Sequence, residues 1–310
     1  MHSVYSDVKE LLLLSFICYY PSGQVGHIKF LFISCEVLLL AKIIVCGKGG
    51  SGKSTVTALL ARYLAVNGRS VCAIDADESS FSLHRMINLP SPERTLVEEL
   101  GGREAIAKGF SSGMSLEKIK DPRFSRGLHV RDLPCTCVSC RDNLYLVSIG
   151  KIREPKEGCS CVMTDLARQF ISMLYRGNWT YLVDTSSPME HVARSLYEAC
   201  DEFLVVLDPT MESLELAVKM REFSAKLNKR IYLILNKTSR RTKTHMTDVL
   251  KANDLEPAAV IPYFPALEKA SMKGEPLPLL KTVIHPLMNL VDVLFDRFQL
   301  ESAFMTSTIK

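Results

Sequence analysis

Short apolar runs alternate with helix-like stretches along most of this chain. The apolar runs are rich in β-branched residues and occupy residues 43–46, 71–75, 144–149, 180–184, 203–207, 231–235 and 258–261. Most are continuously apolar, which is typical of strands covered by helices on both faces. The stretches between them predict helices at 53–67, 162–176, 190–199, 212–227, 242–252 and 283–299. This order predicts an α/β fold with a doubly wound, mostly parallel sheet.

The pattern also divides the chain into segments. Residues 42–300 carry the alternation and predict one domain, with residues 301–310 as a short tail. Within that domain, residues 78–143 lack regular apolar spacing and contain several glycine and serine turns. We therefore expect a helical and loop insertion at about 78–143.

Residues 1–41 precede the first strand of the predicted domain. The run 11–20 has the length of a signal-peptide core, but no clean small-residue cleavage site follows it. Three charged residues interrupt the apolar run 28–46, whereas a membrane-spanning helix needs about 20 nearly uncharged residues. We predict no membrane-spanning helix here. Residues 1–41 are interpreted either as an N-terminal appendage or as an upstream extension that is not native.

Composition narrows the class of protein. The 310 residues are 47% hydrophobic and 23% charged, which fits a globular protein. The 38 basic and 34 acidic residues give a net charge of +4, too balanced to predict a nucleic-acid or membrane partner. The ten cysteines are too few for a disulfide scaffold. They favour a reducing compartment, and we expect a cytoplasmic protein.

A glycine-rich loop joins the run 43–46 to the helix predicted from residue 53. It matches the phosphate-loop pattern G-x-x-x-x-G-K-[ST] in the required strand and helix context. In such a loop Lys53 reaches the β- and γ-phosphates, and the Ser54 hydroxyl ligates Mg²⁺. Backbone N–H groups cradle the phosphates, and the residues expected to do so are Gly49, Gly50, Ser51, Gly52, Lys53, Ser54 and Thr55. The predicted cofactors are therefore ATP and Mg²⁺.

A second lysine, Lys48, lies five residues before Lys53 in the same loop. The resulting motif K-G-G-x-G-K-[ST]-T resembles that of the deviant Walker A ATPases, the group that includes MinD, ParA and the nitrogenase iron protein. The resemblance implies an enzyme that hydrolyses ATP to ADP and phosphate. It also implies a homodimer in which Lys48 reaches the partner's nucleotide, so that it is catalytic together with Lys53.

Acidic residues end two of the predicted strands. Asp75 and Asp77 close the run AIDAD, and Asp184 ends the strand at 180–184. Ligands of open α/β sheets bind at these carboxyl ends. The resemblance implies that Asp77 orients the attacking water, Asp75 supports the magnesium shell and Asp184 is the Walker B aspartate. A turn or helix cap is the alternative for any one of them.

Two further positions match the nucleotide site of the resembled family. Asn236 follows the strand at 231–235, where relatives place an asparagine that bonds adenine, and Pro262 opens a loop that resembles the one closing over the base. An ordinary turn is the alternative for both. The segment 185–188 ends in proline where relatives carry glycine, and Glu78 stands where proline is usual. Because proline has no N–H to donate, we expect an altered hydrolysis rate rather than lost binding.

Cys159 and Cys161 precede a predicted helix. Two thiolates leave a tetrahedral site incomplete, and a symmetric dimer would supply the other two. Together with the pair Asp75 and Asp77, this Cys-x-Cys motif is typical of the carbon monoxide dehydrogenase nickel-insertion ATPases, which the chain resembles over residues 42–300. The resemblance implies a metallochaperone that holds Ni²⁺ or Zn²⁺ across its homodimer. Its partner would be a client metalloenzyme such as carbon monoxide dehydrogenase. Incidental thiols are the alternative.

A second cluster contains Cys135, Cys137 and Cys140, with a Cys-x-x-Cys spacing common in zinc and iron–sulfur sites. It either adds ligands to the first site or holds a separate metal.

Two other functions stay open. An iron–sulfur carrier ATPase would use this cluster, although Ni²⁺ or Zn²⁺ is favoured over an iron–sulfur cluster. A partition or positioning ATPase of the ParA or MinD type would need a basic DNA-binding face or a membrane helix, and the helix at 283–299 has no basic polar face.

Overall fold

A computed structural model describes most of the chain. Its backbone is described over residues 15–19, 25–29, 42–113, 115–116, 127–152, 161–186 and 193–307. Side chains are described over residues 42–113, 115–116, 127–152, 161–186 and 196–294. The chain divides into two units, one of residues 39–297 and one of residues 1–38 with 298–310.

The larger unit is built on one eight-stranded sheet with the order β10-β9-β8-β3-β7-β4-β6-β5. All neighbouring pairs are parallel except β5 and β6, which are antiparallel. The strands are β3 Lys42–Cys46, β4 Ser70–Asp75, β5 Val138–Arg141, β6 Leu144–Ser148, β7 Trp179–Asp184, β8 Glu202–Leu207, β9 Arg230–Thr238 and β10 Pro257–Pro262. This confirms the predicted doubly wound, mostly parallel α/β fold.

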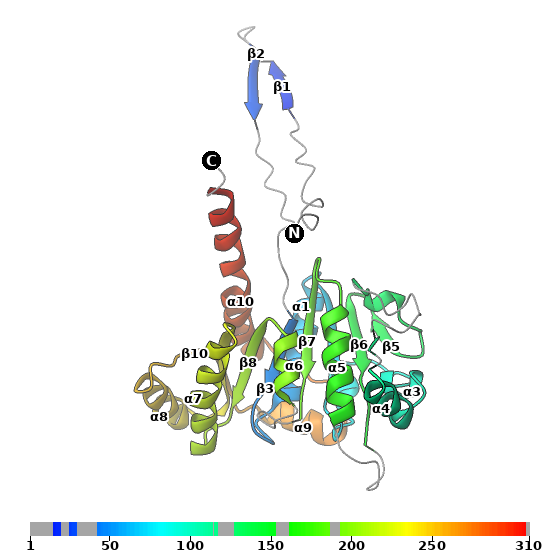
Figure 1. Ribbon diagram of the computed structural model, residues 1–310. Helices are drawn as coiled ribbons and strands as arrows, with labels where there is room; N and C mark the ends of the chain where they lie inside the picture. Colours follow the sequence, from blue (N-terminus) through cyan, green and yellow to red (C-terminus); the bar gives the residue numbers. More distant parts are fainter. Residues whose placement is uncertain are drawn as a thin grey trace. The chain divides into compact units, whose positions relative to one another are not determined.

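Helices cover both faces of this sheet. In Figure 1, α5, α6 and α7 lie in front of the strands and α1 lies behind them. The helices are α1 Lys53–Val66, α2 Leu83–Met86, α3 Leu96–Glu99, α4 Arg103–Ser111, α5 Cys161–Met173, α6 Ala193–Ala199, α7 Met211–Lys226, α8 Arg240–Lys251, α9 Pro265–Lys273 and α10 Lys281–Ser307, with a 3-10 turn, η3, at Val130–Asp132. Since helices shield both faces, every residue of β3, β6, β7 and β8 is buried, as their continuously apolar sequences predict.

The predicted elements agree with the structure in all seven strands and in the six helices. Three features were not predicted. The segment 78–143 contains a strand, β5, as well as helices and loops; α9 was missed; and α10 runs beyond residue 299 to Ser307. β5 escaped the sequence pattern because it is four residues long and at the edge of the sheet, where only Ser139 is fully buried. A half-exposed edge strand carries no continuous apolar run.

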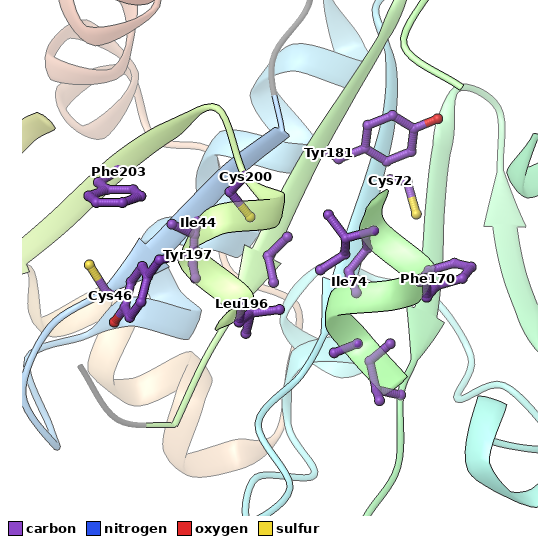
Figure 2. Close-up of a cluster of buried hydrophobic side chains, with 14 of the residues drawn as sticks. Ile44, Cys46, Cys72, Ile74, Phe170, Tyr181, Leu196, Tyr197, Cys200 and Phe203 are labelled. Carbon is purple, nitrogen blue, oxygen red and sulfur yellow. The ribbon is translucent and has the colours of Figure 1, made fainter. Parts of the chain in front are cut away.

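Buried apolar side chains fill both sides of the sheet, and one large cluster lies between the sheet and the helices in front of it. Figure 2 shows Ile44 and Cys46 of β3 close to Tyr197 of α6, with Phe203 of β8 beside them. The rings of Tyr197 and Phe203 meet edge to face at 5.1 Å between centroids. Burial raises the pKa of the Cys46 thiol to about 12. Such a thiol stays protonated and packs as a small apolar side chain.

The smaller unit contains a two-stranded antiparallel pair, β1 Ser15–Tyr19 and β2 Val25–Lys29. Most of the residues before position 42 lie outside the described part, so the interpretation of 1–41 stays a prediction. Within the residues that the structure describes, no helix combines the length and apolarity required to cross a bilayer.

Candidate functional site

The loop from β3 to α1 is a tight turn that depends on two glycines. At Gly47, φ is +150° and an added Cβ would lie 2.3 Å from the carbonyl oxygen of Val206. At Gly52, φ is +100° and a Cβ would lie 2.2 Å from Nδ2 of Asn236. Residues with a side chain rarely adopt such positive φ angles. The glycines of the motif therefore allow the loop to approach β8 and β9 closely.

The remaining loop residues surround the start of α1. Gly49 and Gly50 are exposed, Ser51 is buried, and Ser54 and Thr55 are half-buried in the first turn of the helix. Within the described part of the chain, no side chain caps the N-terminus of α1, whereas threonine or serine side chains cap α3, α7 and α8. An uncapped N-terminus leaves backbone N–H groups available for an anion. The uncapped N-terminus of α1 directly follows the glycine-rich loop, as a phosphate-binding site at the predicted place requires.

Lys53 lies within this loop. Its ammonium donates a hydrogen bond of 3.2 Å to the carbonyl of Lys48, and the residue is buried. A buried ammonium bound to a single carbonyl has two further N–H groups that can reach phosphate oxygens. The contact of Lys53 with the β- and γ-phosphates stays a prediction.

Asp184 ends β7 beside the loop. It pairs in register with Val45 of β3 and with Asp75 of β4, so the carboxyl ends of three strands lie in one row. Asp184 is fully buried, and its Oδ2 has no hydrogen-bond partner among the described residues. Burial raises its pKa to about 7, against the opposing effect of the nearby Ser54 hydroxyl. A buried carboxylate with one free oxygen beside a serine hydroxyl fits a hydrated Mg²⁺ ion, for which oxygen ligands are preferred.

Asp75 is held by a residue that the sequence analysis did not identify. The Lys151 ammonium lies 2.7 Å from Oδ2 of Asp75 and 2.6 Å from the carbonyl oxygen of Asp77. Burial raises the pKa of Asp75 to about 6, and Lys151 acts in the opposite direction. The only sequence signal for Lys151 is its place just after a strand end. A lone lysine there is ordinarily read as solvated.

The carboxylate of Asp77 is bonded within its own loop. Its Oδ1 accepts hydrogen bonds from the backbone N–H of Ser79 at 2.9 Å, from the Ser79 hydroxyl at 2.6 Å and from the N–H of Ser80 at 3.2 Å. These bonds fix the turn after β4. The predicted role of Asp77 in orienting water stays a prediction.

Lys48 is held by acids of its own protomer. Its ammonium lies 3.2 Å from Oδ2 of Asp208, at the end of β8, and 3.5 Å from Oε2 of Glu212 in α7. The hydrogen bond to Asp208 raises the pKa of Lys48. For Asp208, hydrogen bonds from Ser213, Thr210 and Lys48 together outweigh the effect of burial and lower its pKa. The predicted contact of Lys48 with a partner's nucleotide would require exchange of this ion pair.

The two residues predicted to bind the base lie in neighbouring strands, Asn236 in β9 and Pro262 at the end of β10. The Asn236 amide donates a hydrogen bond of 2.8 Å to the Ser51 carbonyl, so it supports the loop. Pro262 is exposed at the end of β10, and the N–H of the next residue donates to the Thr238 carbonyl at 2.9 Å. Their contacts with adenine stay predictions.

The segment after β7 is described only in part. The Thr185 hydroxyl donates to the Val45 carbonyl at 3.0 Å. The Ser186 hydroxyl donates to Oε2 of Glu78 at 3.2 Å, which links the segment after β7 to the loop after β4. Pro188 lies outside the described residues, so its predicted effect on hydrolysis is not tested by the structure.

The predicted metal-binding cysteines are also described in part. Cys159 lies outside the described residues. Cys161 is the first residue of α5, and its sulfur is in a disulfide bond. The free cysteines of the described part are Cys46, Cys72, Cys135, Cys137, Cys140 and Cys200.

The second cysteine cluster is spread over the edge of the sheet. Cys135 and Cys140 are exposed, whereas Cys137 is buried with its sulfur 4.0 Å from the Thr95 carbonyl oxygen. Among the described side chains, no three His, Cys, Asp or Glu residues gather closely enough to hold a metal ion. Within one protomer, Cys135, Cys137 and Cys140 therefore form no preformed three-ligand site.

The central strand leads through a glycine-dependent loop into an uncapped helix, next to the buried carboxylate of Asp184. This arrangement suits a nucleoside triphosphate bound with magnesium, and it defines the class of P-loop nucleotide hydrolases. Comparison with known sequences identifies the family within that class. The CobQ/CobB/MinD/ParA nucleotide binding domain matches residues 42–277, and the chain belongs to this family of P-loop ATPases.

Individual relatives agree with this assignment. An uncharacterized ATP-binding protein of Methanocaldococcus jannaschii is 36% identical over 237 residues, which are 76% of this chain and 93% of that protein. The carbon monoxide dehydrogenase accessory protein CooC of Rhodospirillum rubrum is 28% identical over 239 residues, 75% of this chain and 89% of CooC. Among solved structures, MinD of Pyrococcus horikoshii complexed with Mg-ADP has a TM-score of 0.59 at 22% identity, covering 82% of this chain and 95% of MinD. The similarity to MinD shows that the two proteins share a fold.

Proposed function

We propose that this ATPase is a metallochaperone that dimerises around Mg-ATP, binds Ni²⁺ or Zn²⁺ through Cys159 and Cys161, and delivers nickel to a metalloenzyme such as carbon monoxide dehydrogenase. The observation that carries the proposal is the place of Cys161. Cys161 is the first residue of α5, and its sulfur is in a disulfide bond with a second cysteine. Reduction of that disulfide in a reducing compartment yields two thiols close together, and thiolates are soft ligands that suit both metals.

The likeness to CooC supports the choice of this function over others. It extends over 239 residues, which are 89% of the length of CooC, so it is not limited to one local motif. Two thiolates from each protomer would complete a four-coordinate site only in a dimer. The metal would then be held when ATP brings two protomers together and released when they separate.

Elemental analysis of reduced protein tests this proposal. The protein, purified without oxygen, is loaded with Ni²⁺ or Zn²⁺ and passed through a sizing column with ADP or a non-hydrolysable ATP analogue. We expect one metal ion per dimer with the analogue, since four thiolates fill one site. The double variant Cys159→Ser with Cys161→Ser should lose the metal and keep nucleotide binding.

The exposed cysteines provide a matched control. Cys135→Ser with Cys140→Ser also removes two thiols, but these are free and distant in sequence from α5. This variant should keep the full metal content. Full metal content in the Cys159 and Cys161 variant would refute the proposal, and iron with sulfide that depends on Cys135 and Cys140 would favour the iron–sulfur carrier instead.

A further inference from the structure

Residues 149–152 form a short connecting strap between β6 and the segment that leads to Cys161. The strap is bonded by its backbone to the loop after β4. The N–H of Ile149 donates to the Asp75 carbonyl at 3.0 Å, and the N–H of Ile152 donates to the Glu78 carbonyl at 3.0 Å. The strap therefore follows the loop that carries Asp75 and Asp77.

Lys151 is the charged attachment of this strap. Its ammonium contacts Oδ2 of Asp75 at 2.7 Å, the Asp77 carbonyl at 2.6 Å and the Ser80 carbonyl. Three acceptors use all three N–H groups of an ammonium. The Lys151 and Asp75 side chains are only 7% and 8% exposed, so solvent screens their attraction weakly. Lys151 thus joins the strap to the carboxylate and to two peptide groups of one loop.

The opposite side of the strap packs against α5. A Cβ at Gly150 would lie 2.8 Å from Sδ of Met163 and 2.7 Å from a methyl carbon of Val97. The absence of a side chain at Gly150 is therefore what lets Met163 approach the strap. Met163 is buried and lies two residues after Cys161, in the first turn of α5. The strap contacts both the loop after β4 and the turn that begins with Cys161.

We propose that Lys151 is a positioning residue that couples the nucleotide state at Asp75 to metal binding at Cys161. Asp75 lies in register beside Asp184, whose buried carboxylate fits Mg²⁺. A magnesium ion arriving with ATP is a second cation next to a carboxylate that already holds the Lys151 ammonium. Repulsion between two cations in a buried site is strong. Movement of Lys151 shifts the strap, and the contact of Gly150 with Met163 transmits the shift to α5.

This inference rests on the proposed function, because it requires a metal at the thiols, and coupling between two sites is reciprocal. The affinity for metal must then depend on the nucleotide. The measurement is the Kd for Zn²⁺, obtained by competition with a chromophoric chelator under reducing conditions, in ADP and in a non-hydrolysable ATP analogue. For the wild-type protein we expect the two Kd values to differ by about tenfold or more, as is typical of coupled sites.

The variants separate coupling from simple structural damage. Lys151→Met should bring the two Kd values to within about twofold of each other while the zinc stoichiometry stays the same. Lys151→Arg keeps the charge and should restore most of the difference. Gly150→Ala, whose Cβ would meet Met163 of α5 and Val97 of α3 and leaves the Lys151 contacts with the loop after β4 in place, should also reduce the difference and decides the matter if Lys151→Met does not fold.

A matched control is Lys229→Met. The Lys229 ammonium also donates to backbone carbonyls, those of Tyr197 at 3.0 Å and Glu198 at 2.6 Å, but away from the strap. It should keep the wild-type difference between nucleotides. A wild-type-sized difference in Lys151→Met and Gly150→Ala, or no difference in the wild type, overturns the coupling. Zinc binding that persists in the Cys159 and Cys161 variant overturns the proposed function instead.

Discussion

Replacing Asp184 with asparagine should change stability in a way that depends on pH. The carboxylate is fully buried, and its Oδ2 has no partner among the described residues. Burial raises its pKa from 3.8 to about 7. Each pKa unit corresponds to about 1.4 kcal/mol, so the ionised group destabilises the folded chain by about 4 kcal/mol above pH 7.

The sign follows from proton binding. Between pH 3.8 and about 7 the folded chain holds a proton on Asp184 that the unfolded chain has lost. Wild-type stability therefore falls as pH rises through this window. The Asp184→Asn variant lacks this loss. Its free energy of unfolding relative to the wild type should rise by about 2 to 3 kcal/mol between pH 5 and pH 8. Burial of the asparagine N–H₂ group lowers the stability of the variant by the same amount at every pH, so it does not change this rise.

Urea denaturation without magnesium or nucleotide measures this difference. Asp208→Asn is the matched control, since Asp208 also ends a strand but has a lowered pKa. A lowered pKa stabilises the folded chain above the unfolded pKa, and that stability is lost as pH falls through the folded pKa. The control should thus be less stable than the wild type at pH 8 and approach it on acidification. If the difference in unfolding free energy between Asp184→Asn and the wild type did not change with pH, the conclusion that burial raises the pKa of Asp184 would be wrong.

Three further changes test other parts of the structure. Gly52→Ala should abolish nucleotide binding, measured by titration with a fluorescent ATP analogue, because the new Cβ would lie 2.2 Å from the Asn236 amide at a φ of +100°. Lys48→Ala should leave urea stability nearly unchanged, since its ion pair is partly exposed, yet abolish ATP-dependent dimerisation on a sizing column. Burial lowers the pKa of Lys42 to about 8, so the folded chain disfavours its charge and stability should rise between pH 8 and 10. Lys42→Met should remove this rise in urea titrations at several pH values, and an unchanged rise would exclude Lys42 as its source.

The order of elements and the phosphate loop can be predicted from the amino-acid sequence alone. Strands covered on both faces need continuous apolar runs, and the turn at Gly47 and Gly52 needs residues without a Cβ. Both requirements act within a few neighbouring residues, so the pattern of the chain displays them. The acids Asp75 and Asp184 could be predicted as site residues because parallel strands bring their carboxyl ends to one edge. The register of β4 and β7 places the two acids side by side at this edge, and their roles at the site stay predictions.

The pairing and burial of these groups become visible only in the folded chain. Lys151 lies 76 residues from the carboxylate that it holds, and the contact exists because β4 and β6 are neighbours in the sheet. The unpartnered Oδ2 of Asp184 likewise depends on what α1 and the neighbouring strands place around it. The cysteine spacing at 135–140 suggested a metal site, yet packing buries Cys137 and leaves Cys135 and Cys140 exposed. Charge pairing and burial depend on contacts between residues that are distant in sequence, and a local sequence pattern does not record such contacts.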